Sequence, residues 1–195
     1  PEQVKEQLFQ AAGSAQQDIE KGVSLLMAQD LGRAEEVLKK ASDKAGPEQA
    51  RATYLLGHVR RLQGRPDEAR QTFQQALQRD AKMAEALHGL AQIEQAAGNA
   101  AAAEEFCRKA IVARPEYADA YYSLAEILKP QNRTSDAMAA YQQLLAKDSQ
   151  QSYALFSIAL IDFAQGNAKS AAEKFKKAIE TNKGWRFADA GLAWN

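Results

Sequence analysis

The chain has 195 residues with 25 basic and 25 acidic side chains, so its formal net charge is zero. This balance argues against nucleic acid or an acidic membrane surface as a partner, because both favour a basic excess. No apolar run approaches the roughly 20 residues that span a bilayer, and the single cysteine, Cys107, excludes a disulfide within the chain. The composition therefore predicts neither nucleic-acid binding nor membrane insertion, and it leaves both the cytoplasm and the periplasm open as compartments.

The start of the chain carries no recognisable secretory signal. It begins at Pro1 rather than at an initiator Met, which is compatible with the removal of a leader or an upstream domain. Hydrophobic residues make up 46% of the sequence, many of them alanine, and prolines and glycines are few. Alanine is the strongest helix former, so this composition favours an all-α fold.

A small residue recurs at intervals of 35, 34, 34 and 34 residues along the chain. Two further columns lie four and seven residues after it, a spacing that keeps all three on one face of a helix. The first column is Ala34, Ala69, Ala103, Ala137 and Ala171; the second is Leu38, Phe73, Cys107, Tyr141 and Phe175; the third is Ala41, Ala76, Ala110, Leu144 and Ala178. The period predicts repeated pairs of antiparallel helices.

In chain order, the pattern predicts an N-terminal helix over residues 1–14, followed by a degenerate repeat over 15–48. In that repeat Gln29 stands where later units have Gly or Asn, and Gly32 is expected to move the turn by three residues. Four regular repeats follow, and residues 186–195 are expected to begin a C-terminal helix. The regular repeats are 50–83, 84–117, 118–151 and 152–185, and the whole chain forms one array.

Helix-breaking residues separate the two helices of each regular repeat. They are Gly64-Arg65-Pro66, Gly98-Asn99, Asn132-Arg133 and Gly166-Asn167. Gly or Asn at such a point can adopt the left-handed conformation that ends a helix, and Pro66 suits the first turn of the next helix.

These columns resemble the tetratricopeptide repeat family, most clearly in residues 84–117, with Leu90-Ala91, Gly98-Asn99, Ala103, Ala110 and Pro115 in register. The resemblance covers residues 15–183. It implies a right-handed superhelical solenoid of antiparallel helix pairs that binds a protein or peptide partner and is not an enzyme. An alternative reading is the substrate-recognition or assembly region of a larger enzyme, such as a protein-modifying transferase.

In the family, the second, fifth, ninth and twelfth positions of each first helix line a concave groove. Large aromatic and cationic side chains at such positions are typical of protein interfaces. The resemblance places these candidates there: Arg51, Tyr54, His58, Arg61, His88, Gln92, Tyr122, Glu126, Tyr153, Phe156 and Phe163. We expect an acidic end of the partner at Arg51, His58 and Arg61, and an apolar end at Tyr153, Phe156 and Phe163. Packing between neighbouring units is the competing explanation for Phe156 and Phe163.

No metal, cofactor or catalytic site is predicted. His58 and His88 fall short of the three or four ligands that a zinc site needs. Cys107 lies in the column of Phe73 and Tyr141, so it is expected in the core rather than as a nucleophile. The carboxylate-binding residues of chaperone-binding family members have no counterpart here, because Tyr54, Gly89 and Asp119 stand at three of the matching positions.

The C-terminal edge is rich in apolar residues, with Trp185, Phe187, Leu192 and Trp194 close together. Leu192 and Trp194 are two residues apart, so one helical face cannot bury both. The sequence therefore predicts that this edge meets a further segment or associates with another copy of the chain.

Overall fold

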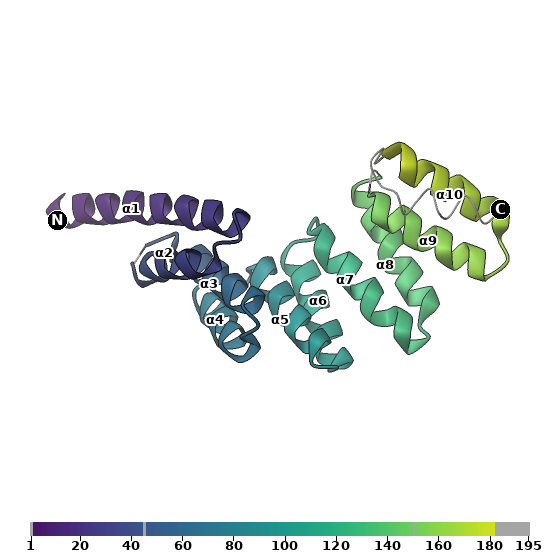
Figure 1. Cartoon of the computed structure of the whole chain (residues 1–195), viewed down its shortest axis with the longest axis horizontal. Coiled ribbons are helices and arrows are strands. Elements are labelled where there is room, and N and C mark those ends of the chain that lie inside the picture. The colour runs from purple at the N-terminus through teal and green to yellow at the C-terminus, as the bar shows by residue number, and fades with distance from the viewer. Residues whose placement is uncertain (1, 45, 150, 182–195) are drawn as a thin grey trace. The chain divides into compact units, whose positions relative to one another are not determined.

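The computed structural model describes residues 2–44, 46–149 and 151–181, with side chains from Ser14 onward. This part of the chain contains α-helices, one short 3-10 helix and no strand, which confirms the all-α prediction (Figure 1). The helices are α1 (Glu2–Met27), α2 (Leu31–Asp43), α3 (Gln49–Leu62), α4 (Pro66–Arg79), α5 (Ala84–Ala96), α6 (Ala100–Ala113), α7 (Ala118–Leu128), η1 (Lys129–Gln131), α8 (Thr134–Lys147), α9 (Ser152–Ala164) and α10 (Ala168–Thr181).

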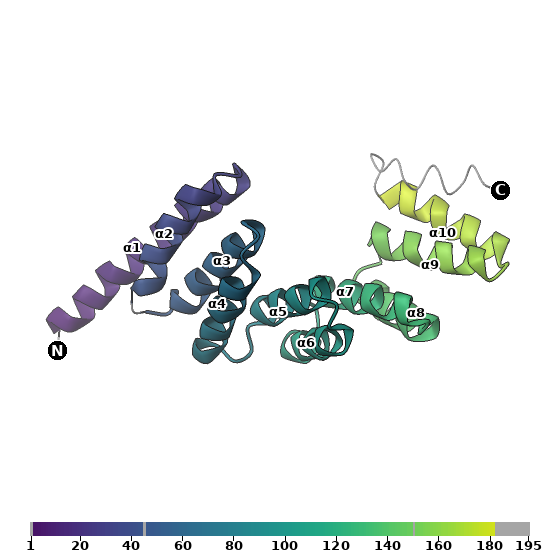
Figure 2. The same ribbon diagram turned by 60° about the horizontal axis from the view of Figure 1, so that its bottom comes forward.

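The helices form two compact units that divide between Arg114 and Pro115. Unit 1 holds the pairs α1/α2, α3/α4 and α5/α6, and unit 2 holds the pairs α7/α8 and α9/α10 (Figures 1 and 2). Helix α6 ends at Ala113 and Arg114 is extended, as expected for the residue before a proline, whose ring disfavours the helical conformation there. A single array over the whole chain stays a prediction.

Within each pair, the small-residue column brings the two helices into close contact. All five alanines of the first predicted column are fully buried. In unit 1, the Phe73 ring fills the space that two glycines leave open. A Cβ atom added at Gly57 would lie 2.8 Å from this ring, and one added at Gly89 would lie 2.6 Å from it. Phe73 therefore joins α4 to its own partner α3 and to the following α5.

Ion pairs add to these contacts between neighbouring pairs of unit 1. Glu35 on α2 pairs with Arg60 on α3 at 3.2 Å and with Arg65 at 2.7 Å. Arg70 on α4 pairs with Glu94 on α5 at 2.9 Å. At the first junction the carboxylate belongs to the helix pair that comes earlier in the chain, and at the second junction it belongs to the later helix pair. These ion pairs therefore favour the native order of the helix pairs.

The predicted helix-ending residues adopt the left-handed conformation. Gly64, Gly98 and Gly166 have φ angles of 73°, 79° and 80°, and Asn132 has a φ of 59°. The expectation that Gly32 moves the first turn is wrong. Gln29 itself has a φ of 59°, and Gly32 lies inside α2. The packing of α1 against α2 sets the turn, and it outweighs the modest cost of this conformation for a residue with a side chain.

The helix predicted over residues 1–14 and the first helix of the repeat predicted from residue 15 are one helix, because α1 runs without interruption from Glu2 to Met27. Gly13 alone does not end a helix whose other residues there are good helix formers, since its cost is only about 1 kcal/mol relative to alanine. Helix α1 therefore extends well past α2 (Figures 1 and 2). The helix predicted at 186–195 and the apolar C-terminal edge lie outside the described residues.

Candidate protein-binding faces

The first-helix stripe consists of the second, fifth, ninth and twelfth positions of each regular repeat, counted from residues 50, 84, 118 and 152. On α3, Arg51 is exposed and pairs with Glu48 at 3.7 Å, one helical turn away. Tyr54 is half-buried, and its ring stacks on Phe73 with the centroids 6.0 Å apart. Tyr54 therefore covers the core aromatic while part of its ring stays accessible to solvent.

His58 and Arg61 form the polar centre of the α3 stripe. Arg61 Nη2 lies 3.4 Å from His58 Nδ1, and the Tyr54 and His58 rings are 6.3 Å apart. Burial lowers the pKa of His58, and the charge of Arg61 lowers it further. Burial also lowers the pKa of Arg61. No carboxylate is among the causes of either shift, so Arg61 carries the positive charge of this surface beside a His58 ring whose protonation is disfavoured.

The α5 stripe offers less surface than expected. His88 is only 7% exposed, so it contributes little to a face that a partner could touch. Gln92 remains half-buried. Glu85 at the start of the same stripe is paired with Arg114, whose two Nη atoms lie 2.7 and 2.9 Å from the carboxylate oxygens.

On α7 of unit 2, Glu126 belongs to an internal network. It accepts a short hydrogen bond from the Tyr141 hydroxyl and one of 3.0 Å from Lys129 Nζ. Tyr122 packs against Tyr141 and Tyr153, with centroid distances of 5.9 and 6.2 Å. Burial and the charge of Glu126 raise the pKa of Tyr122 and that of Tyr141. Glu126 therefore organises the face rather than offering a free carboxylate.

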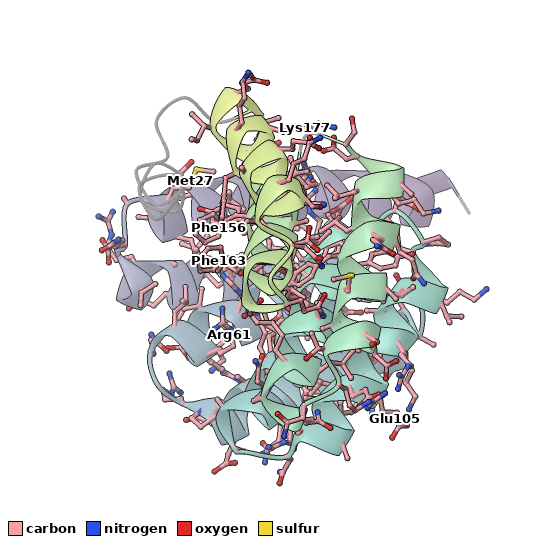
Figure 3. All side chains as sticks on the ribbon, turned by 90° about the vertical axis from the view of Figure 1, so that its right-hand side faces the viewer. Met27, Arg61, Glu105, Phe156, Phe163 and Lys177 are labelled. Carbon is pink, nitrogen blue, oxygen red and sulfur yellow. The ribbon has the colours of Figure 1, made fainter. Side chains whose placement is uncertain are left out.

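On the α9 stripe, Phe156 and Phe163, for which packing between units was the competing explanation, differ in their contacts and exposure. Phe156 is half-buried and packs edge-on against Phe175, 5.3 Å between centroids. Phe163 stays 39% exposed, and Tyr153 and Leu160 on the same stripe are 52% and 44% exposed. Both phenylalanines project from α9 (Figure 3), but only Phe163 has substantial surface free.

A pocket of about 260 Å³ opens between the starts of α7 and α9. Ala118, Asp119, Tyr122, Leu144, Gln151 and Tyr153 line it. The stripe positions predicted Tyr122 and Tyr153 from the sequence. Leu144 and Gln151 were missed because they lie off the stripe, on α8 and in the turn before α9.

A second pocket, of about 560 Å³, lies on unit 1 beside α6. Its lining includes Lys82, Leu87, Glu105, Lys109 and Val112. The repeat pattern gave no sign of it, because most of its residues lie on a second helix, away from the stripe.

Three further features of the described ranges bear on chemistry other than binding. Cys107 is fully buried, as predicted, and burial raises the pKa of its thiol to about 12, so it is inert as a nucleophile. Among the described residues, no cluster of His, Cys, Asp or Glu could hold a metal ion. None of the described helices is long and apolar enough to cross a bilayer.

These features define an all-α helix-pair repeat protein with aromatic and cationic side chains along its first helices. Residues 19–84 match one family model described as tetratricopeptide repeat, and residues 60–111 and 94–156 match a second with the same description. The matches together span 19–156, well over half of the chain. The chain belongs to the tetratricopeptide repeat family, and it is a protein-interaction scaffold of a generally non-catalytic class.

Solved structures support the same fold. A crystal structure of MamA is 26% identical in sequence, with 84% of this chain and 95% of that chain covered and a TM-score of 0.68. PilF of Pseudomonas aeruginosa is 17% identical, with coverages of 88% and 78% and a TM-score of 0.80. YrrB, described as a tetratricopeptide repeat protein with an unusual peptide-binding site, is 19% identical, with 88% of both chains covered and a TM-score of 0.62. No curated protein matches the sequence.

Proposed function

We propose that the chain is a scaffold or adaptor that binds a segment of a partner protein along its first-helix stripes. The observation that carries this proposal is the exposure of Tyr153, Leu160 and Phe163 on α9, at 52%, 44% and 39%. Large apolar side chains that share one helical face are normally covered, because leaving them in water forgoes about 25 cal/mol per Å² of apolar surface. A partner segment that covers the stripe would recover that free energy.

The sequence of α9 supports this interpretation. Its one charged residue, Asp162, is buried and accepts hydrogen bonds of 2.7 Å from both Ser170 and Lys174 on α10. The helix therefore lacks the solvated polar face that an ordinary surface helix has. Its other sides pack against α8 and α10, and the stripe is the part left for a partner.

Within unit 1, the stripe residues of α3 suit polar contacts with a partner. Tyr54 and Arg61 combine contact area with hydrogen-bond donors, which is why both residue types are common at the centres of interfaces. The pocket between Tyr122 and Tyr153 has room for one side chain of the partner. YrrB, a fold neighbour described as having an unusual peptide-binding site, supports a peptide as the kind of ligand.

Peptide display against the immobilised full chain tests the proposal. Enriched peptides are then measured by calorimetry against the wild type and against the Leu160→Ser and Phe163→Ser variants. We expect each variant to weaken binding about tenfold, equivalent to about 1.4 kcal/mol. Val112→Ser is the matched control, because Val112 is 82% exposed on α6, away from the stripe.

The proposal fails if display yields no binder, or if the enriched peptides bind both stripe variants as tightly as the wild type. A loss confined to Val112→Ser would place the binding site beside α6 instead. Unchanged circular dichroism spectra for all three variants ensure that altered binding does not reflect unfolding.

A further inference from the structure

Arg61 differs from the other half-buried arginines of the described ranges in one respect, because each of the others pairs with a carboxylate. Those paired arginines are Arg60, Arg65, Arg70, Arg114 and Arg133. Arg79 also lacks an acid, but it is exposed and donates to the Gln75 carbonyl at 3.0 Å. Arg61 is thus a partly desolvated cation without a counter-charge.

The hydrogen bonds of Arg61 are also incomplete. Its Nε is shielded from solvent and has no hydrogen-bond partner among the described residues. Its Nη2 makes one long contact of 3.4 Å to His58 Nδ1. Nη1 makes no hydrogen bond to a described residue. Unlike Nε, it is not shielded from solvent, so a ligand can reach it. A buried donor left unpaired costs about 1–3 kcal/mol, and retaining such a group calls for an explanation.

The hydrogen-bonding groups of Arg61 and His58 determine which kind of ligand fits them. A guanidinium only donates, so His58 Nδ1 accepts from Arg61 and the neutral ring carries its hydrogen on Nε2. His58 Nδ1 therefore holds Nη2 in place, and the guanidinium offers only donors to a ligand. The one acid on the neighbouring α5 stripe, Glu85, is already paired with Arg114 at 2.7 Å, and no carboxylate of a described residue pairs with Arg61.

We propose that Arg61, supported by His58, is the receptor for a carboxylate of the partner segment. The proposal rests on the proposed function and names the partner's chemistry at one point of the α3 stripe. A carboxylate at Nη1 and Nη2 supplies the missing counter-charge, and charge-assisted hydrogen bonds to a guanidinium are about twice as strong as neutral ones. The acid can be an Asp or Glu side chain or the C-terminus of the partner.

Nuclear magnetic resonance of the full chain tests this without a known partner. The shielded Arg61 Nε–H gives the signal to follow, together with the His58 ring. The probes are N-acetylglutamate N-methylamide, with a side-chain carboxylate, and N-acetylalanine, with a terminal one. N-acetylglutamine N-methylamide is the neutral control, and added NaCl keeps the ionic strength equal in all titrations.

We expect saturable shifts at Arg61 and His58 with at least one acid and none with the glutamine analogue. Whichever acid gives the larger shifts identifies the source of the carboxylate. Arg61→Gln should abolish the shifts of His58 and Arg61→Lys should weaken them, because lysine keeps the charge but loses the planar fork. Arg79→Gln is the matched control and should leave them unchanged.

Two results overturn the inference. One is the absence of saturable shifts with both acids, and the other is shifts of equal size with the glutamine analogue or in Arg61→Gln. Neither result depends on the α9 stripe. If Leu160→Ser binds peptides as the wild type does, a carboxylate can still bind at Arg61. If no carboxylate binds at Arg61, the α9 stripe can still bind a peptide. The two proposals therefore fail separately.

Discussion

Arg60 and Arg61 are neighbours on α3 with opposite surroundings. Arg60 bonds to Glu35 at 3.2 Å and to the Thr72 hydroxyl at 2.8 Å, so its charge stabilises the contact between two helix pairs. Arg61 has a desolvated guanidinium and no carboxylate partner among the residues that the structure describes. Of these two consecutive arginines, Arg60 therefore contributes to the stability of the fold, whereas the uncompensated charge of Arg61 lowers that stability.

Replacing each with methionine, which has a similar length and helix propensity, should separate these roles. We expect Arg60→Met to lower the free energy of unfolding by about 1–2 kcal/mol, since it leaves Glu35 with fewer partners. Arg61→Met should leave it unchanged or raise it by up to about 1 kcal/mol, because an uncompensated charge is removed. Urea unfolding measures both. A larger loss for Arg61→Met than for Arg60→Met would show that Arg61 is a structural residue.

The lowered pKa of His58 predicts how stability depends on pH. In the unfolded chain the ring binds a proton near its ordinary pKa of 6.5, whereas in the folded chain burial and Arg61 oppose protonation. The unfolded state therefore gains protons first as the pH falls, and folding should weaken between about pH 7 and pH 5. His58→Gln should reduce that slope in urea unfolding measured at several pH values. The same slope in both proteins would contradict the prediction.

At the scale of the helix, two glycines show how the fold uses the same residue differently. Gly89 on α5 lies against Phe73, where an added Cβ would approach to 2.6 Å. Gly32 on α2 has nothing within 4 Å of such an atom. The first glycine is required by packing, and the second only weakens its helix.

Gly32→Ala should therefore raise the free energy of unfolding by about 0.5–1 kcal/mol, because alanine loses less conformational entropy in a helix. Gly89→Ala should lower it by about 1–3 kcal/mol, because the Phe73 ring must move in a filled core. Thermal unfolding of the two variants gives the comparison. Equal effects of the same sign would show that the contact at Gly89 relaxes without cost.

Most of the fold could be predicted from the sequence, because close packing and turns each impose a specific residue type. The alanine columns marked the helix crossings, and Gly64, Gly98, Asn132 and Gly166 marked the turns. Gln29 could not be predicted, since nothing local favours a left-handed glutamine and only the packing of α1 on α2 requires it. The continuity of α1 was missed because the repeat register marks where a repeat begins and does not show whether the helix before it continues.

The candidate site could be predicted less completely. Stripe positions located Tyr54, His58, Arg61 and Tyr153 on accessible faces. Position alone could not separate Phe156 from Phe163, which are seven residues apart on one face, because Phe175 on α10 packs against Phe156. The burial of His88, the pairing of Glu126 and the absence of an acid beside Arg61 all depend on residues from other helices.

At the scale of the molecule, contacts run mainly between helices that are adjacent in the chain. Stability in such an array is approximately a sum of local terms. Damage to one pair should therefore spread to its neighbours and fade beyond them.

Ala69→Trp in unit 1 tests this, because Ala69 is fully buried where α4 meets α3 and tryptophan cannot fit there. Hydrogen exchange should become faster in α3 and α4 and, to a smaller extent, in α2 and α5. Exchange in α9 and α10 of unit 2 should stay as in the wild type. Faster exchange throughout the chain would mean that the two units unfold as one cooperative body.

The burial of Cys107 has a practical consequence. With its pKa raised to about 12 and its side chain fully enclosed, the native thiol will not react with maleimide dyes or spin labels at neutral pH. Cysteines introduced at exposed sites such as Val112 in unit 1 and Gln165 in unit 2 can then be labelled selectively, without first replacing Cys107. Energy transfer or dipolar spectroscopy between such labels would report the distance between the two units in solution and any change when a partner binds.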